Sequence, residues 1–218
     1  MGWNNMTSIV GSATDDSVNG TGADEMILGL GGEDTLKGGN GDDTVSGGAG
    51  DDKVSGNQGN DVVKGGFGDD FINGGEGSDV LVGGHGNDEF IWTANQIEDG
   101  ATDVIVDFAA IDKGKGVDSL SLLDFGGATV QINAIAVGDY EGGAMNGEDL
   151  RNNATDDVIL TISSYDEHGG IIATQELVML DVWRRDSIDA LEAAFAELGF
   201  EGEIGEYVPV EYGVDLLA

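Results

Sequence analysis

The sequence predicts an all-β protein in which short strands stack into parallel sheets and a β-rich region follows them. Two observations support this prediction. Between Gly29 and Ile91 the 218-residue chain repeats a nine-residue pattern seven times without a gap, and each copy ends in a short apolar segment. After Trp92 the period stops and longer alternating or apolar segments replace it. We therefore expect a lead-in over residues 1–19, a repeat region over 20–91 and a capping region over 92–218.

The composition is strongly acidic, with 43 acidic and eight basic residues and a net charge of −35. Such a surface repels nucleic acid and anionic lipid, so we expect neither as a partner. We also expect no membrane insertion, since no segment has 18 consecutive apolar residues. The first 20 residues lack the basic and apolar regions of a secretory signal peptide, so export is expected to use another route.

Each position of the repeat has a physical reading. The first, second and fourth positions are mostly glycine, which permits positive φ and a tight turn. The last three residues form a minimal strand whose central side chain is apolar in all seven copies and points inward. One such unit cannot bury its apolar side chain alone, so we expect the copies to wind into a coil with two copies per turn.

The sixth position is aspartate in all seven copies, and the coil stacks these aspartates along two edges. Neighbouring carboxylates about 4.8 Å apart repel each other by roughly 3–4 kcal/mol at an effective dielectric of 20. The metal-free repeat is therefore expected not to fold, whereas several Ca²⁺ ions, bound by carboxylates and main-chain carbonyls, would remove the conflict. The two edges comprise Asp34, Asp52, Asp70 and Asp88, and Asp43, Asp61 and Asp79.

An imperfect copy precedes Gly29, in the segment NGTGADEMILG. Asp24 lies ten residues before Asp34, so either one residue is inserted or Glu25 takes the place of the aspartate. The only histidine in the repeats, His85, stands at the variable third position, where a solvent-facing loop residue is expected.

Copies such as GGNGDDTVS and GGAGDDKVS resemble the RTX (repeats-in-toxin) calcium-binding repeat, which forms a parallel β-roll. The resemblance implies that each ion lies between loops of successive coils. It implies carboxylate ligands from the seven aspartates above and from Asp24 in the imperfect copy. Leu30 and Asn57 replace the second glycine, which keeps the carbonyl but can distort the loop. The carbonyl ligands it implies belong to Gly38, Gly39, Gly41, Gly47, Gly48, Gly50, Gly56, Gly59, Gly65, Gly66, Gly68, Gly74, Gly75, Gly77, Gly83, Gly84 and Gly86. A metal-free glycine-rich solenoid is the alternative.

The capping region predicts five strands, at residues 103–108, 117–125, 129–137, 157–165 and 170–183, and one amphipathic helix at 187–198. Its beginning resembles the segment after the repeats in serralysin-type proteases and alginate epimerases. The final residues Asp215, Leu216, Leu217 and Ala218 resemble an uncleaved type I secretion signal. With the repeats, this resemblance implies the type I secretion machinery as a partner and an extracellular location.

No catalytic motif is recognised. The sequence has no H-E-x-x-H, no G-x-S-x-G and no cysteine, so we expect a protein that is not an enzyme. Two functions remain: a calcium-binding module that folds after export, or an accessory module that binds polysaccharide or another surface ligand. An enzyme with a new active site in residues 92–218 is a third alternative.

Overall fold

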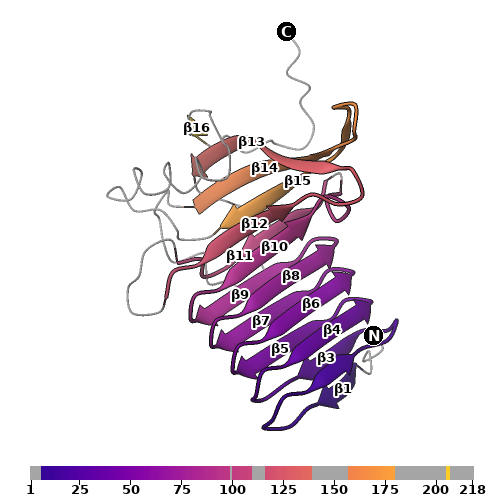
Figure 1. Cartoon of the computed structure of the whole chain (residues 1–218), viewed down its shortest axis with the longest axis vertical. Helices are drawn as coiled ribbons and strands as arrows, with labels where there is room; N and C mark the ends of the chain where they lie inside the picture. Colours follow the sequence, from indigo (N-terminus) through magenta and orange to yellow (C-terminus); the bar gives the residue numbers. More distant parts are fainter. Residues whose placement is uncertain (1–5, 99, 110–115, 139–156, 180–204, 207–218) are drawn as a thin grey trace, which may run out of the picture.

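The computed structural model describes residues 6–98, 100–109, 116–138, 157–179 and 205–206, and in this part of the chain it is all-β (Figure 1). The predicted helix at 187–198 and the C-terminal residues 215–218 lie outside the described residues. The strands are β1 (Thr7–Val10), β2 (Ser17–Asn19), β3 (Glu25–Leu28), β4 (Thr35–Asn40), β5 (Thr44–Ala49), β6 (Lys53–Gln58), β7 (Val62–Phe67), β8 (Phe71–Glu76), β9 (Val80–His85), β10 (Glu89–Thr93), β11 (Thr102–Ile105), β12 (Ser119–Leu123), β13 (Thr129–Gly138), β14 (Asp157–Tyr165), β15 (Ile171–Met179) and β16 (Gly205–Glu206).

The repeats form a coil with one sheet on each side. Odd-numbered strands β1 to β11 pair in one sheet, and even-numbered strands β2 to β12 pair in the other. All of these pairs are parallel, and Thr35 pairs with Lys53 while Thr44 pairs with Val62. The offset of 18 residues confirms the prediction of two copies per turn.

The coil is longer than the predicted repeat region at both ends. Strands β1 and β2 lie in the predicted lead-in, yet they pair in parallel with β3 and β4. After Ile91, β11 pairs with β9 and β12 pairs with β10, again in parallel. The coiled part of the molecule therefore includes strands on both sides of residues 20–91.

The capping region extends one of the two sheets. Strand β15 pairs in parallel with β11, and β14 and β13 follow as an antiparallel meander (Figure 1). All five predicted strands are present within a few residues of their expected limits. The end of the odd-numbered sheet is thus covered by β15 instead of being left as an open edge.

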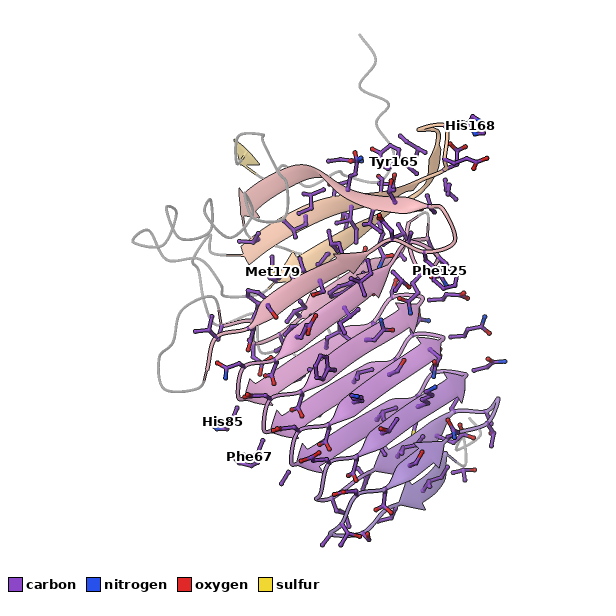
Figure 2. All side chains as sticks on the ribbon, viewed as in Figure 1. Phe67, His85, Phe125, Tyr165, His168 and Met179 are labelled. Atoms are coloured by element: carbon purple, nitrogen blue, oxygen red, sulfur yellow. The ribbon has the colours of Figure 1, made fainter. Side chains whose placement is uncertain are left out.

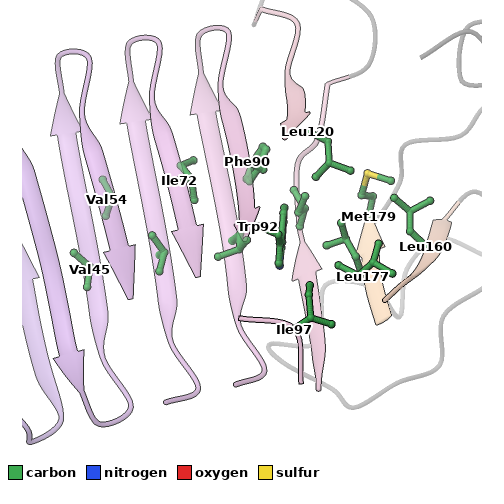
Figure 3. Close-up of a cluster of buried hydrophobic side chains, with 14 of the residues drawn as sticks. Val45, Val54, Ile72, Phe90, Trp92, Ile97, Leu120, Leu160, Leu177 and Met179 are labelled. Atoms are coloured by element: carbon green, nitrogen blue, oxygen red, sulfur yellow. The ribbon is translucent and has the colours of Figure 1, made fainter. Parts of the chain in front are cut away.

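The core is a continuous stripe of apolar side chains between the two sheets (Figure 3). The eighth residue of every copy is at most 2% exposed, which confirms its predicted inward position. Near the end of the coil Trp92 and Ile105 join this stripe to Leu177 and Met179 of β15. The eighth-position residues are Leu36, Val45, Val54, Val63, Ile72, Leu81 and Phe90.

Candidate calcium sites along the edges of the coil

The sixth-position acids form one row beside each sheet, just before or at the start of its strands. Both predicted edges are present, and each row continues beyond the repeats. The row beside the even-numbered strands comprises Asp16, Asp34, Asp52, Asp70, Asp88 and Asp118. The row beside the odd-numbered strands comprises Glu25, Asp43, Asp61, Asp79 and Asp103.

In each acid after the first of its row, one carboxylate oxygen accepts a main-chain hydrogen bond from the acid one turn earlier. Asp34 N–H, for example, donates to Asp52 Oδ1 over 2.7 Å, and Asp52 N–H donates to Asp70 Oδ1 over 2.8 Å. The same bond recurs along both rows. These bonds orient the carboxylates in the same way, with each Oδ1 directed at the main-chain N–H of the acid one turn earlier.

The second carboxylate oxygen has no partner in any of the seven repeats. These Oδ2 atoms are inaccessible to solvent and accept no hydrogen bond. A buried polar atom without a partner costs about 1–3 kcal/mol, and more when the group is charged. The structure thus places one unsatisfied carboxyl oxygen in each copy, on Asp34, Asp43, Asp52, Asp61, Asp70, Asp79 and Asp88.

Each unsatisfied oxygen lies against the first glycine of its own copy. A Cβ on Gly29 would stand 2.1 Å from Asp34 Oδ2 and 2.5 Å from the carbonyl oxygen of Gly47 on the next coil. A Cβ on Gly56 would meet Asp61 Oδ2 and the Gly74 carbonyl in the same way. Carboxylate and carbonyl oxygens therefore converge where the glycine has no side chain, which is an oxygen-only environment of the kind Ca²⁺ accepts.

The glycine carbonyls predicted as ligands lie between successive coils. The carbonyl oxygens of Gly38, Gly41, Gly47, Gly48, Gly50, Gly56, Gly59, Gly66, Gly68, Gly74 and Gly86 each face a glycine one turn away. The other predicted glycines occupy equivalent positions in their copies: Gly39, Gly65, Gly75, Gly77, Gly83 and Gly84. In the described residues, no three carboxylate or imidazole side chains gather around one point. At most two carboxylates therefore lie together between successive coils, and the other oxygens there belong to main-chain carbonyls.

Burial raises the pKa of six repeat aspartates. Loss of water is the main cause, repulsion from neighbouring carboxylates adds to it, and the main-chain N–H donors oppose it. The pKa of Asp61 and that of Asp70 rise to about 7, and that of Asp79 to about 8. The pKa of Asp52 and that of Asp88 rise to about 6, and the pKa of Asp43 is also raised. Without a cation, Asp61, Asp70 and Asp79 therefore bind protons for much of the time near neutral pH.

Glu25, not Asp24, occupies the row in the imperfect copy. Glu25 is buried and its N–H donates to Asp43 Oδ1, as the aspartates of the row do. Asp24, the residue before Glu25, lies outside the row. Its Oδ1 accepts the N–H of Asp42 one turn later. Of the two alternatives for this copy, the structure has Glu25 and not Asp24 in the aspartate's place: no residue is inserted, and the nine-residue frame continues upstream through GTGADEMIL and GSATDDSVN.

Two features were not found from the sequence. Fifth-position side chains form a second, exposed ladder, in which Asp42 Oδ1 accepts the N–H of Asn60 and Asp69 Oδ1 accepts that of Asn87. The polar fifth residue of every copy was the available signal. Asp103 and Asp118 were not predicted either. They follow Asp79 and Asp88 by 24 and 30 residues, so they do not fit the 18-residue offset of the repeats.

The fold and the acid rows define a parallel β-solenoid with stacked carboxylates along both edges. The family model of the RTX calcium-binding nonapeptide repeat matches four times, at residues 8–36, 19–54, 28–63 and 55–90. Residues 8–90 are therefore RTX calcium-binding repeats.

Other comparisons add little. Among solved structures, the chain is similar to the AlgE6R3 subunit of the Azotobacter vinelandii mannuronan C5-epimerase, with 23% identity over 99% of this chain and 98% of that one and a TM-score of 0.25. A comparison with curated proteins finds no match. RTX repeats are typical of extracellular proteins, and no helix able to cross a membrane is found in the described part of the chain.

Proposed function

We propose that this protein is a non-catalytic module that folds when its repeats bind Ca²⁺ outside the cell, after type I secretion. The observation that carries the proposal is the set of seven buried Oδ2 atoms without partners. Without a cation, repulsion along the rows and the unsatisfied oxygens destabilise the folded chain. Low cytosolic calcium would keep the repeats unfolded for export, and extracellular calcium would fold them.

Main-chain N–H groups, glycines and carboxylates contribute to binding in different ways. The main-chain N–H groups hold Oδ1 of each aspartate and thereby fix the direction of Oδ2. The first-position glycines leave room for Oδ2 beside a carbonyl of the next coil. Bound calcium supplies the positive charge that offsets the stacked carboxylates. The oxygen-only ligand set favours Ca²⁺ over Mg²⁺, which requires tighter geometry and retains its waters.

The test is a calcium titration of chelator-treated protein, followed by far-UV circular dichroism, with magnesium as the control. We expect a cooperative rise of β signal at roughly 0.1–1 mM calcium, the range of extracellular modules. Magnesium at the same concentrations should give little β signal. Complete β structure in excess chelator would contradict calcium-dependent folding and favour a metal-free solenoid.

The proposed export route rests on the resemblance of Asp215, Leu216, Leu217 and Ala218 to a type I signal. Deleting these four residues should abolish export from a host that carries a type I exporter, while leaving the calcium titration of the purified protein unchanged. Undiminished export of the shortened chain would exclude this signal.

A second candidate function is the binding of a polysaccharide or another surface ligand. Phe67 and His85, at the third position of two copies on the same edge, stack with their ring centroids 5.1 Å apart, and Phe67 is 63% exposed. Figure 2 shows both side chains pointing away from the coil, as expected for His85. Glycan-array binding with and without calcium, and its loss in Phe67→Ala, would support this function. No retention in either condition would leave the folding module.

A further inference from the structure

The four acids at the ends of the rows differ from the seven between them. Each end residue, Asp16, Glu25, Asp103 or Asp118, belongs to the same ladder of main-chain bonds. None of the four has the unsatisfied oxygen found on the repeat aspartates. The protein itself supplies the donor in each case.

At the N-terminal ends the donors come from the second position of the copy. Ser12 donates to Asp16 Oδ2 through its N–H, over 2.6 Å, and through its hydroxyl, over 2.9 Å. Thr21 donates to Glu25 Oε2 through its N–H over 3.1 Å and to Oε1 through its hydroxyl. In the other seven copies this position is glycine, Leu30 or Asn57, none of which carries a hydroxyl.

At the C-terminal ends the donors come from segments that follow the repeats. Asp103 Oδ2 accepts the indole N–H of Trp92 over 2.6 Å and a side-chain N–H of Gln175 on β15. Asp118 Oδ2 accepts the N–H of Ala109 over 2.7 Å. Both aspartates are buried, so these protein donors satisfy carboxylate oxygens that solvent does not reach.

We propose that Asp16, Glu25, Asp103 and Asp118 close the two rows without holding calcium, so that calcium binding is confined to the seven aspartates between them. The oxygen environment does not itself make the difference. A Cβ on Gly11 would meet Asp16 Oδ2 and the Gly29 carbonyl at 2.7 and 2.8 Å, much as at Gly29. The difference is the protein donor, which satisfies the carboxylate that a cation satisfies elsewhere. This inference rests on the proposed calcium-dependent function.

The test compares neighbouring members of one row. Glu25→Gln retains an acceptor for the Thr21 N–H and an amide that can donate to the Thr21 hydroxyl, so it keeps the contacts of the closed end. Asp43→Asn is its matched partner one turn later. Asp16→Asn and Asp34→Asn form the same comparison in the other row. Calcium bound per folded chain is measured by equilibrium dialysis and metal analysis, and folding is checked by circular dichroism.

We expect Glu25→Gln and Asp16→Asn to bind as many ions as the original chain, and Asp43→Asn and Asp34→Asn to bind at least one fewer. Loss of an ion from a folded Glu25→Gln or Asp16→Asn chain would overturn the inference, as would an unchanged count in both inner variants. If the original chain itself bound no calcium, the proposed function would fail, and the two results are therefore distinguishable.

Discussion

Leu30 shows what the second position of a repeat requires of a residue. Its φ is +81°, as is that of Asn57, whereas the equivalent glycines in the other copies have φ between +107° and +131°. A leucine in this region costs about 1–2 kcal/mol, because its Cβ approaches the backbone. The predicted departure from the repeat pattern therefore leaves the loop in place at an energetic cost.

Leu30→Gly should raise the free energy of unfolding of the calcium-loaded protein by roughly 0.5–1 kcal/mol. Relief of the positive φ exceeds the extra entropy that glycine loses on folding. Chemical denaturation in saturating calcium measures the change. Asn57→Gly is the control and should change the stability less, because asparagine tolerates this conformation. A destabilised Leu30→Gly protein would contradict this account.

The fourth-position glycines are required for a different reason, close approach between coils. Gly59 has a φ of +126°, and a Cβ there would stand 2.0 Å from the carbonyl oxygen of Gly41. Gly59→Ala should therefore destabilise the calcium-loaded protein by about 3 kcal/mol or more, from strain and displacement of the neighbouring coil.

Gly22→Ala is the matched control for Gly59→Ala, since a Cβ on Gly22 has nothing within 4 Å. Thermal unfolding in saturating calcium should separate the two variants clearly, with Gly22→Ala close to the original protein. Equal melting temperatures would show that the coils adjust to an added methyl group.

Strand β15 is the element that joins the meander to the coil. It pairs with β11, packs Leu177 and Met179 against the core, and places Gln175 beside Asp103 and Trp92. The strands themselves were predictable from alternating apolar residues. This junction was not, because Gln175 is 72 residues from Asp103 and no local pattern relates the two.

Trp92→Phe should destabilise the calcium-loaded protein by about 1–3 kcal/mol. The ring remains in the core, but the indole N–H that donates to buried Asp103 Oδ2 is lost. Phe125→Leu, at an exposed position after β12, is the control and should stay within about 0.5 kcal/mol of the original. Denaturant unfolding measures both, and an unaffected Trp92→Phe protein would mean that Gln175 alone satisfies the carboxylate.

At the scale of the whole molecule, the sequence predicted the coil, its two edges and its core, because each depends on a period of nine residues. The limits of the coil were not predictable in the same way. The connections from β10 to β11 and from β11 to β12 are longer than those between repeat strands, so spacing alone does not identify Asp103 and Asp118. At the other end, Glu25 and Asp16 keep the frame, but the substituted positions around them obscure it.

The metal-free protein should be more structured in mild acid than at alkaline pH. An aspartate whose pKa is raised on folding binds more protons in the folded chain than in the unfolded chain. Its contribution to the free energy of unfolding is therefore fully present below the unfolded pKa near 4. It is lost as the pH rises through the folded values of about 6 to 8. Circular dichroism of chelator-treated protein from pH 4.5 to 8.5 should show a falling β signal.

Salt provides the control for this pH dependence. The net charge of −35 also becomes smaller in acid, but 0.5 M sodium chloride screens repulsion between exposed charges and leaves buried groups largely unaffected. The fall in β signal should therefore persist in salt. Calcium affinity should show the opposite trend and weaken as the pH falls from 8 to 6, since protons compete for the same carboxylates. A β signal that rises with pH in chelator would contradict the raised pKa values of the buried aspartates.

The pairing of each strand of the repeats with the one 18 residues away has a consequence for how the length of this protein can change. Removing or duplicating two adjacent copies alters the number of turns and keeps each remaining strand in its own sheet. Removing a single copy moves all later strands to the opposite sheet, so the meander on β11 is turned by half a revolution relative to the N-terminus. Variation in repeat number in relatives of this chain is thus expected to favour even steps wherever the relative orientation of the two ends matters.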